Sequence, residues 1–208
     1  MLRPSSRLAK ALATRFRTLD STRRQVEALS PRQLISKTGA ERVYEALYIS
    51  ACTALEVFLE ELFIGQLVEN AGLKSSQIDV APRLRIGSHR VARELVTGVN
   101  RKYVDWLPYD HTAGRAELFF RGGRPFSQLS EGDRSQLKTC SIVRNAIAHK
   151  SRFSQQLFEK KVIGSTPLPP RERKPSGYLR GFGSAAPPRT RFEILLGTML
   201  KVATVLAA

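Results

Sequence analysis

The sequence is poor in cysteine and histidine, the residues that build disulfide frameworks and most metal sites. Its 208 residues include two cysteines, Cys52 and Cys140, and three histidines, His89, His111 and His149. Both cysteines lie in apolar, helix-like stretches, which is typical of small core residues in a reducing compartment. The histidines share no ligand spacing, so we expect no metal site and no cofactor.

Acidic residues and long apolar runs are also scarce. The chain has 34 Lys and Arg against 18 Asp and Glu, for a net charge of +16. This excess predicts attraction to a polyanion, with RNA or DNA before an anionic membrane surface, although it could serve solubility alone. Charged residues interrupt both of the most apolar windows, 46–64 and 192–208. We therefore expect a cytoplasmic protein without a membrane span.

Strand alternation is nearly absent, and helical periodicity takes its place. The length and the 42% apolar content predict one soluble domain with a hydrophobic core. We expect an all-α helical bundle. Its long helices should cover residues 5–29, 40–70 and 131–161, with a closing helix over 191–207. No phosphate-binding loop, dinucleotide fingerprint or serine-hydrolase elbow occurs.

The N-terminal stretch is basic before its first acid, Asp20. Its cations superficially resemble those of a transit peptide. We favour a mature first helix, because apolar residues keep a helical period through the stretch: Leu8, Leu12, Phe16 and Leu19. The basic outer face of this helix could be a solvated surface or could face nucleic acid. The helix, over residues 5–30, could also be an extension of the main domain.

Two long connections interrupt the helical pattern. The first, 98–130, combines aromatic residues with cations at Arg101, Lys102, Arg115, Arg121 and Arg124. That pairing can stack and clamp single-stranded nucleic acid, although the aromatics could equally be core residues. The second, 164–190, is basic and rich in Pro, Gly and Ser. It could be a flexible arm or a surface loop.

One stretch combines chemically useful side chains with a helical pattern. Arg144 and His149 are separated by Asn-Ala-Ile-Ala. On a helical wheel Arg144 falls within the apolar stripe, whereas Asn145 and His149 share a second face. A guanidinium on an apolar face needs a carboxylate partner, or a cleft that holds water or an anion. The candidate partners are Glu56 and Glu60, one turn apart on the longest helix. The stretch could therefore be a core helix with a paired arginine, or an active site.

The run Ile142-Val-Arg-Asn-Ala-Ile-Ala-His-Lys-Ser151 resembles the signature of the HEPN superfamily. These small α-helical domains carry an Arg, four to six residues and then a His, often with Asn directly after the Arg. Pro125-Phe-Ser127, the aspartate-bearing start of the motif helix and the closing Phe192-Glu-Ile-Leu-Leu stretch resemble the RiboL-PSP-HEPN branch. The resemblance covers about residues 40–207.

The resemblance implies an activity and a set of site residues. Many HEPN proteins are metal-independent endoribonucleases that act as toxins or phage-defence effectors, and they dimerise so that two motifs line one cleft. Others are binding modules without catalysis. Arg144 and His149 would be the catalytic pair, with Asn145 beside them and Glu56 or Glu60 in support. An acidic antitoxin protein is a possible partner. We expect nucleic-acid contacts from basic residues near the motif and in the first connection: Lys150, Arg101, Lys102, Arg121 and Arg124.

The chemistry of RNA cleavage suits these side chains. The reaction needs a base for the 2′-OH proton, an acid for the 5′-oxygen, and positive charge for the transition state. Imidazole can act as base or acid near neutral pH, and arginine binds phosphate oxygens bidentately. One chain offers one such histidine and a symmetric dimer offers two. The expected products carry a 2′,3′-cyclic phosphate and a 5′-OH. The alternatives are a binding module that does not cleave RNA and a plain helical scaffold with a buried Arg–Glu pair.

Overall fold

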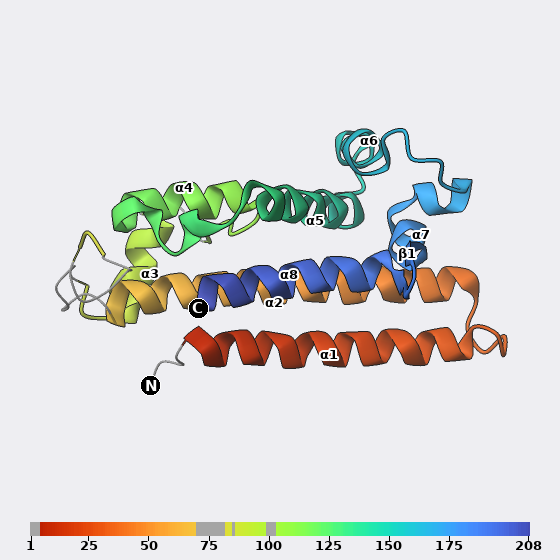
Figure 1. Cartoon of the computed structure of the whole chain (residues 1–208), viewed down its shortest axis with the longest axis horizontal. Coiled ribbons are helices and arrows are strands. Elements are labelled where there is room, and N and C mark those ends of the chain that lie inside the picture. The colour runs from red at the N-terminus through yellow and green to blue at the C-terminus, as the bar shows by residue number, and fades with distance from the viewer. Residues whose placement is uncertain (1–4, 70–81, 85, 99–102) are drawn as a thin grey trace.

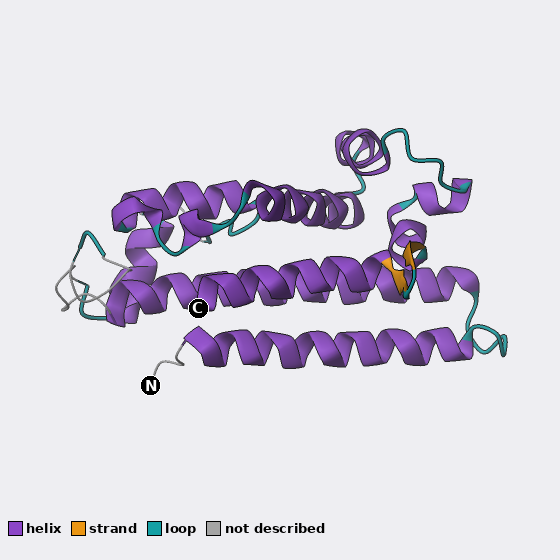
Figure 2. Ribbon diagram, in the orientation of Figure 1, coloured by secondary structure: helices purple, strands orange, loops and turns teal. Residues whose placement is uncertain are grey.

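The protein is an elongated helical bundle (Figure 1), seen in a computed structural model that describes residues 5–69, 82–84, 86–98 and 103–208. Its long helices are α1 (Ser5–Leu29), α2 (Lys37–Glu69), α5 (Glu131–His149) and α8 (Arg191–Ala207). The short helices are α3 (His89–Thr97), α4 (Tyr109–Phe119), α6 (Arg152–Phe158) and α7 (Pro175–Arg180). The strands β1 (Phe182–Ala185) and β2 (Pro188–Thr190) form a small antiparallel hairpin. The predicted all-α class is confirmed (Figure 2).

Helix α2 is the centre of the bundle. It is apolar on several faces and contacts α1, α5 and α8 as well as the short helices α3, α4 and α7. A helix that is apolar on most sides must be covered by neighbours to leave water. Its largest buried side chains include Tyr44, Tyr48 and Phe63, all with no exposed surface. Figure 1 shows α1 on one side of α2 and the α4–α5 layer on the other.

Helix α1 is amphipathic, as its sequence period predicts. Leu8, Leu12 and Phe16 are buried against the bundle, and α1 packs on both α2 and α8. Near its start, the Ser5 hydroxyl donates a hydrogen bond of 2.9 Å to the carbonyl of Ala207 in α8. The two ends of the described fold therefore lie side by side (Figure 1).

The predicted helix over 131–161 is wrong as a single element. α5 ends at His149, and Lys150 adopts a left-handed conformation with φ 49°. Ser151 then caps α6, its hydroxyl accepting from the backbone N–H of Ser154 at 3.2 Å. Helicity continues through α6 into the π-helical segment η3 (Glu159–Ile163), but along a new axis that crosses α5 (Figure 1). The serine cap satisfies one of the first N–H groups of a second helix, which favours a new helix start after the break.

The Pro/Gly-rich connection over 164–190 is folded. It contains the 3₁₀ segment η4 (Pro170–Arg173), then α7 and the β1–β2 hairpin. Arg180 makes a bidentate pair with Glu27 of α1, with nitrogen–oxygen distances of 2.7 and 2.9 Å. Leu179 is completely buried. The interpretation as a flexible arm is therefore wrong, because long-range ion pairs and apolar burial hold this segment to the bundle.

The aromatics of the first connection belong mainly to the core. Trp106, Phe120 and Phe126 surround Phe63 of α2, with ring centroids 4.9 to 5.3 Å apart. Their burial supports the core interpretation over a stacking surface. The two cysteines are also buried and free, as predicted. None of the helices in the described ranges is long and apolar enough to cross a membrane.

Candidate active site

The motif helix α5 is fixed at its first turn. The hydroxyl of Ser130 caps the helix by accepting from the N–H of Asp133 at 3.1 Å. The Asp133 carboxylate accepts from Lys201 of α8 at 2.6 Å and from the Ser130 hydroxyl at 2.8 Å. These contacts lower the pKa of Asp133, with the Lys201 hydrogen bond as the largest cause. The start of α5 is therefore held to α8 as well as capped.

The buried face of α5 is broader than the apolar stripe on the helical wheel. Ile142 and Ala146 are buried together with the predicted core residues. From Cys140 to the end of α5, the residues that are not buried form an uncovered strip: Arg144, Asn145, Ala148 and His149. The wheel was wrong to place Arg144 inside the core stripe: its side chain keeps 32% of its surface exposed. Neighbouring helices leave this edge of α5 open, so the guanidinium reaches solvent.

Arg144 is oriented by two neighbours. Its Nη1 donates to Oδ1 of Asn145 at 2.9 Å, and its Nη2 lies 4.0 Å from Oε1 of Glu56 on α2. The Arg144–Asn145 hydrogen bond joins the two faces of α5 that the helical wheel separates. Arg144 and the Asn145–His149 face therefore form one continuous surface. The second contact is a long ion pair, which leaves much of the donor capacity of the guanidinium available.

Glu56 is a partly desolvated carboxylate at this edge. Its side chain is 24% exposed. Burial raises its pKa above the ordinary value, Arg144 acts in the opposite direction, and Asp105 adds to the increase. Of the two carboxylates predicted to partner Arg144, Glu56 is thus the one in reach. Glu60, one turn farther along α2, pairs with Arg93 of α3 at 3.1 Å.

The Arg144–Glu56 pair belongs to a row of four ion pairs along α2. The pairs, in order, are Glu41–Arg171 at 2.9 Å, Glu45–Lys150 at 3.9 Å, Glu56–Arg144 at 4.0 Å and Glu60–Arg93 at 3.1 Å. The two outer pairs are within hydrogen-bonding distance and the two inner pairs are not. Both inner cations belong to the motif region. They are therefore the cations of this row least engaged by their carboxylates.

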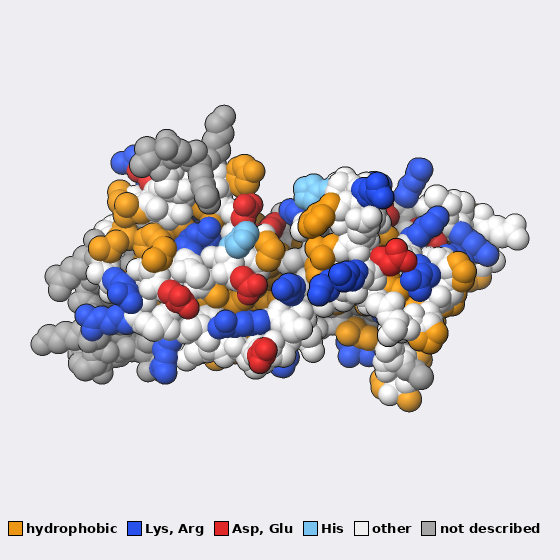
Figure 3. All heavy atoms as spheres, turned by 90° about the horizontal axis from the view of Figure 1, so that it is seen from above, with side chains coloured by type: hydrophobic (Ala, Val, Ile, Leu, Met, Phe, Trp, Pro, Cys, Tyr) orange, Lys and Arg blue, Asp and Glu red, His pale blue; other side chains and the backbone are white. Residues whose placement is uncertain are grey.

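His149 is the last residue of α5 and is exposed. The break that follows it is braced, because Nε2 of Gln155 in α6 donates to the carbonyl of Ala146 at 2.6 Å. This bond satisfies one of the carbonyls that a helix end leaves without a partner. The imidazole thus stands at a fixed helix end. On the face of the molecule that Figure 3 shows, Lys and Arg side chains are spread among fewer acidic ones.

The other predicted nucleic-acid contacts lie elsewhere or outside the described residues. Arg121 begins the 3₁₀ segment η1 (Arg121–Gly123), and Arg124 follows it; both are exposed. The next segment, η2 (Phe126–Gln128), is tied to the start of α5, because Arg134 donates to the carbonyl of Ser127 at 3.0 Å. About 22 Å of helix separates that contact from His149, at 1.5 Å per residue. Arg101 and Lys102 lie outside the described residues.

Three residues around the motif were missed from the sequence. Glu45 lies near Lys150, Asp105 acts on Glu56, and Gln155 braces the helix break. One signal was available for Glu45: it precedes Glu56 by three helical turns and so shares its face of α2. Asp105 and Gln155 depend on how a loop and a second helix fold back, which no periodicity shows.

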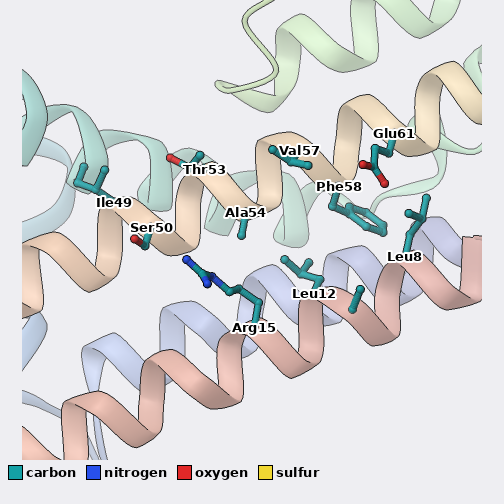
Figure 4. A pocket seen from close by; sticks show the side chains of 11 residues that line it. Leu8, Leu12, Arg15, Ile49, Ser50, Thr53, Ala54, Val57, Phe58 and Glu61 are labelled. Carbon is teal, nitrogen blue, oxygen red and sulfur yellow. The ribbon is translucent and has the colours of Figure 1, made fainter. Parts of the chain in front are cut away.

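The motif lies on an exposed surface of α5, and two grooves of the described structure lie away from it. A groove of about 400 Å³ between α1 and α2 has Leu12 and Phe58 in its wall, with Arg15 reaching in from α1 (Figure 4). A groove of about 590 Å³ runs between α1 and α8, with Phe16 and Leu196 in its wall. Small-molecule sites are usually concave and apolar. An exposed strip with a guanidinium and an imidazole suits a polymer with accessible phosphates better.

The strip has the groups needed for acid–base chemistry on a phosphodiester. Arg144 supplies fixed positive charge, Asn145 orients it, and the exposed His149 can exchange a proton. Within the described ranges, no group of three or more His, Cys, Asp or Glu residues could hold a metal ion. The chain is thus an all-α bundle with a surface Arg–Asn–His site. No protein-family model matches it, and neither a curated protein nor a solved structure is significantly similar to it.

Proposed function

We propose that the chain is a HEPN-like, metal-independent endoribonuclease that acts in the cytoplasm as a homodimer, in the manner of a toxin or phage-defence effector. One observation carries the proposal. The partly exposed Arg144, oriented by Asn145 and only loosely paired with Glu56, shares one uncovered strip of α5 with the exposed His149. The +16 charge of the chain supports an anionic polymer as the substrate.

The proposed reaction is a transesterification within the RNA. One His149 removes the proton of a 2′-OH, and the 2′-oxygen attacks the adjacent phosphorus. The bond to the 5′-oxygen breaks, and that oxygen takes a proton from the His149 of the partner subunit. Arg144 stabilises the charge that develops on the non-bridging oxygens. The products are a 2′,3′-cyclic phosphate and a 5′-OH.

The dimer follows from the single motif histidine in each chain. Acid and base must both be present at one phosphate, and a two-fold axis beside the open edge of α5 would supply both. The uncovered strip ends at His149, so a partner could approach that end without displacing core contacts. The predicted dimer thus buries part of the Asn145–His149 face.

The test is cleavage of single-stranded RNA by the purified protein in EDTA. His149→Ala is expected to reduce the rate by a factor of about 10² to 10⁴, the usual contribution of a general acid–base group. The matched control is His111→Ala, which removes an exposed histidine on α4 and should leave the rate unchanged. Product ends are identified by mass spectrometry. Full activity in His149→Ala, with an intact dimer, would overturn the proposal.

A second candidate is a non-catalytic HEPN-like module that binds RNA or an acidic partner protein such as an antitoxin. The basic face of α1 favours it, because the cations Arg7, Lys10, Arg15 and Arg17 are all exposed there. This function predicts salt-sensitive RNA binding without cleavage. Binding would be unchanged by His149→Ala and reduced by charge reversal at Lys10 and Arg17.

A further inference from the structure

An exposed aromatic side chain follows the motif. Phe153, in the first turn of α6, has 74% of its surface exposed. Other residues of this short helix pack into the fold: Ser154 is buried, and Phe158 packs edge-on against Tyr178 with ring centroids 5.5 Å apart. An exposed phenylalanine gives up most of the free energy that its burial would contribute. Folding alone therefore does not account for an aromatic side chain at this position.

The position of Phe153 relative to His149 is fixed by the helix break. Lys150 makes the turn in the left-handed conformation, and Ser151 caps α6. The Gln155 side chain then ties α6 to the end of α5 through the carbonyl of Ala146, at 2.6 Å. Phe153 thus stands on a braced element directly after the motif and not on a free loop.

The sequence neighbours of Phe153 include several exposed cations. Arg152 precedes it directly, Lys150 lies three residues before it, and Lys160 and Lys161 follow on the same continuous helical segment. Phe153 is the one large hydrophobic exposed between residues 131 and 181, all of which the structure describes. A docking surface for an apolar protein partner would need a contiguous patch. An isolated ring among cations is the arrangement that binds single-stranded nucleic acid, by stacking on bases and pairing with phosphates.

We propose that Phe153 is a stacking platform for one unpaired nucleobase beside the phosphate bound at Arg144 and His149, and that it restricts the substrate to single-stranded RNA. This inference rests on the proposed function, because it needs RNA at that site. A base within a duplex has both faces covered by its neighbours and cannot stack on the ring. Lys150 and Arg152 would hold the phosphates on either side of the stacked nucleotide.

The experiment measures binding separately from cleavage. The probes are 2′-O-methyl oligonucleotides of about 12 residues, which fit one binding site and lack the attacking hydroxyl. The same sequence is used single-stranded, as a duplex, and with abasic residues that keep the phosphates. Phe153→Ala should weaken single-strand binding about tenfold, within the range for one stacked base. Binding of the abasic oligomer should change by less than about twofold.

Two variants sharpen this test. Phe182→Ala, on β1, removes a phenylalanine that is 64% exposed and should leave binding unchanged. Phe153→Trp should retain affinity and show fluorescence quenching with the single-stranded oligomer only. The background fluorescence in this measurement comes from the native Trp106, which is 3% exposed.

Several outcomes would overturn the platform. They are single-strand affinity within about twofold of wild type in Phe153→Ala, equal losses on the abasic oligomer, or loss of the dimer in light scattering. The first of these, with cleavage retained, would leave the proposed ribonuclease intact. Base-dependent binding lost in Phe153→Ala, in a protein that cleaves no RNA, would instead overturn the ribonuclease and keep the platform.

Discussion

The guanidinium of Arg144 lies 4.0 Å from the Glu56 carboxylate, and both side chains reach solvent at the edge of the α2–α5 contact. A scaffold that depended on a buried Arg–Glu pair would lose about 3–5 kcal/mol of stability on removal of the arginine. This open and long pair is expected to contribute less than about 1 kcal/mol.

Arg144→Ala is therefore expected to abolish RNA cleavage while the free energy of unfolding falls by less than about 1 kcal/mol. Urea denaturation followed by circular dichroism measures the second quantity. Leu137→Ala on the same helix is the control: its side chain is completely buried, so it should lose about 2–5 kcal/mol. A comparable loss in Arg144→Ala would support the scaffold function instead.

Glu56→Gln tests the desolvated carboxylate. Burial raises the pKa of Glu56 above its ordinary value of 4.5, so the folded state disfavours its ionised form. Its favourable contribution to stability is present below pH 4.5 and is lost as the pH rises through the folded-state pKa. The stability of Glu56→Gln relative to wild type should therefore increase from pH 4 to pH 7. A relative stability that falls over this range would show that the Arg144 pair dominates.

The Glu27–Arg180 pair should give the opposite pH dependence. The bidentate hydrogen bonds from Arg180 lower the pKa of Glu27 below 4.5, so the ionised form is favoured in the folded state. Its stabilisation is present above pH 4.5 and is lost as the pH falls through the lower folded-state pKa. Arg180→Gln should reduce this acid sensitivity in urea titrations at pH 3 to 6. An unchanged profile would place the acid sensitivity in other carboxylates.

Arg23 and Arg24 offer a matched test of burial. Both contact Asp20, but the Arg23 side chain is 8% exposed and also reaches Glu193 at 2.9 Å, whereas Arg24 is 70% exposed. Arg23→Met should lose about 2–3 kcal/mol, just below the range for a fully buried pair, because both carboxylates keep other partners. Arg24→Ala should lose less than about 0.5 kcal/mol. Similar losses in the two variants would contradict this difference in burial.

Two glycines should respond oppositely to alanine. Gly197 lies in the middle of α8, and an added Cβ would meet only the end of the Arg189 side chain, at 3.4 Å. Gly197→Ala should stabilise the protein by about 0.5–1 kcal/mol through the lower entropy of the unfolded chain. At Gly177 a Cβ would collide with the carbonyl of Arg171, so Gly177→Ala should destabilise it. Melting temperatures compare the two, and a stable Gly177→Ala would show that η4 can shift.

The long helices could be predicted because their signals are local. Apolar periods locate α1 and α8, and the Ser130 cap lies directly before α5. The end of α5 was missed because Lys150 in a left-handed turn has no strong sequence signature, although Ser151 was an available cap. The fold of residues 164–190 depends on the Glu27–Arg180 pair, which joins residues far apart in the chain.

The candidate site was predicted in its residue types but not in its geometry. The charge balance and the motif spacing point to Arg144, His149 and Glu56. A helical wheel does not say which sides of α5 its neighbours cover, so it placed the guanidinium in the core. The pairing of the α2 acids with cations of α3, the motif region and η4 is visible only in the folded structure.

The position of α8 has a consequence for synthesis of the protein. α5 is held from the α8 side by Lys201 at Asp133 and by Thr198, whose hydroxyl donates to Gln136 at 3.1 Å. The Ser5–Ala207 contact then joins α8 to the first turn of α1. α8 follows α5 in the chain by more than 40 residues, so during synthesis the Arg144–His149 pair emerges before the helix that holds α5 in place. The motif helix therefore gains its complete support only once α8 has also been made and has packed against it.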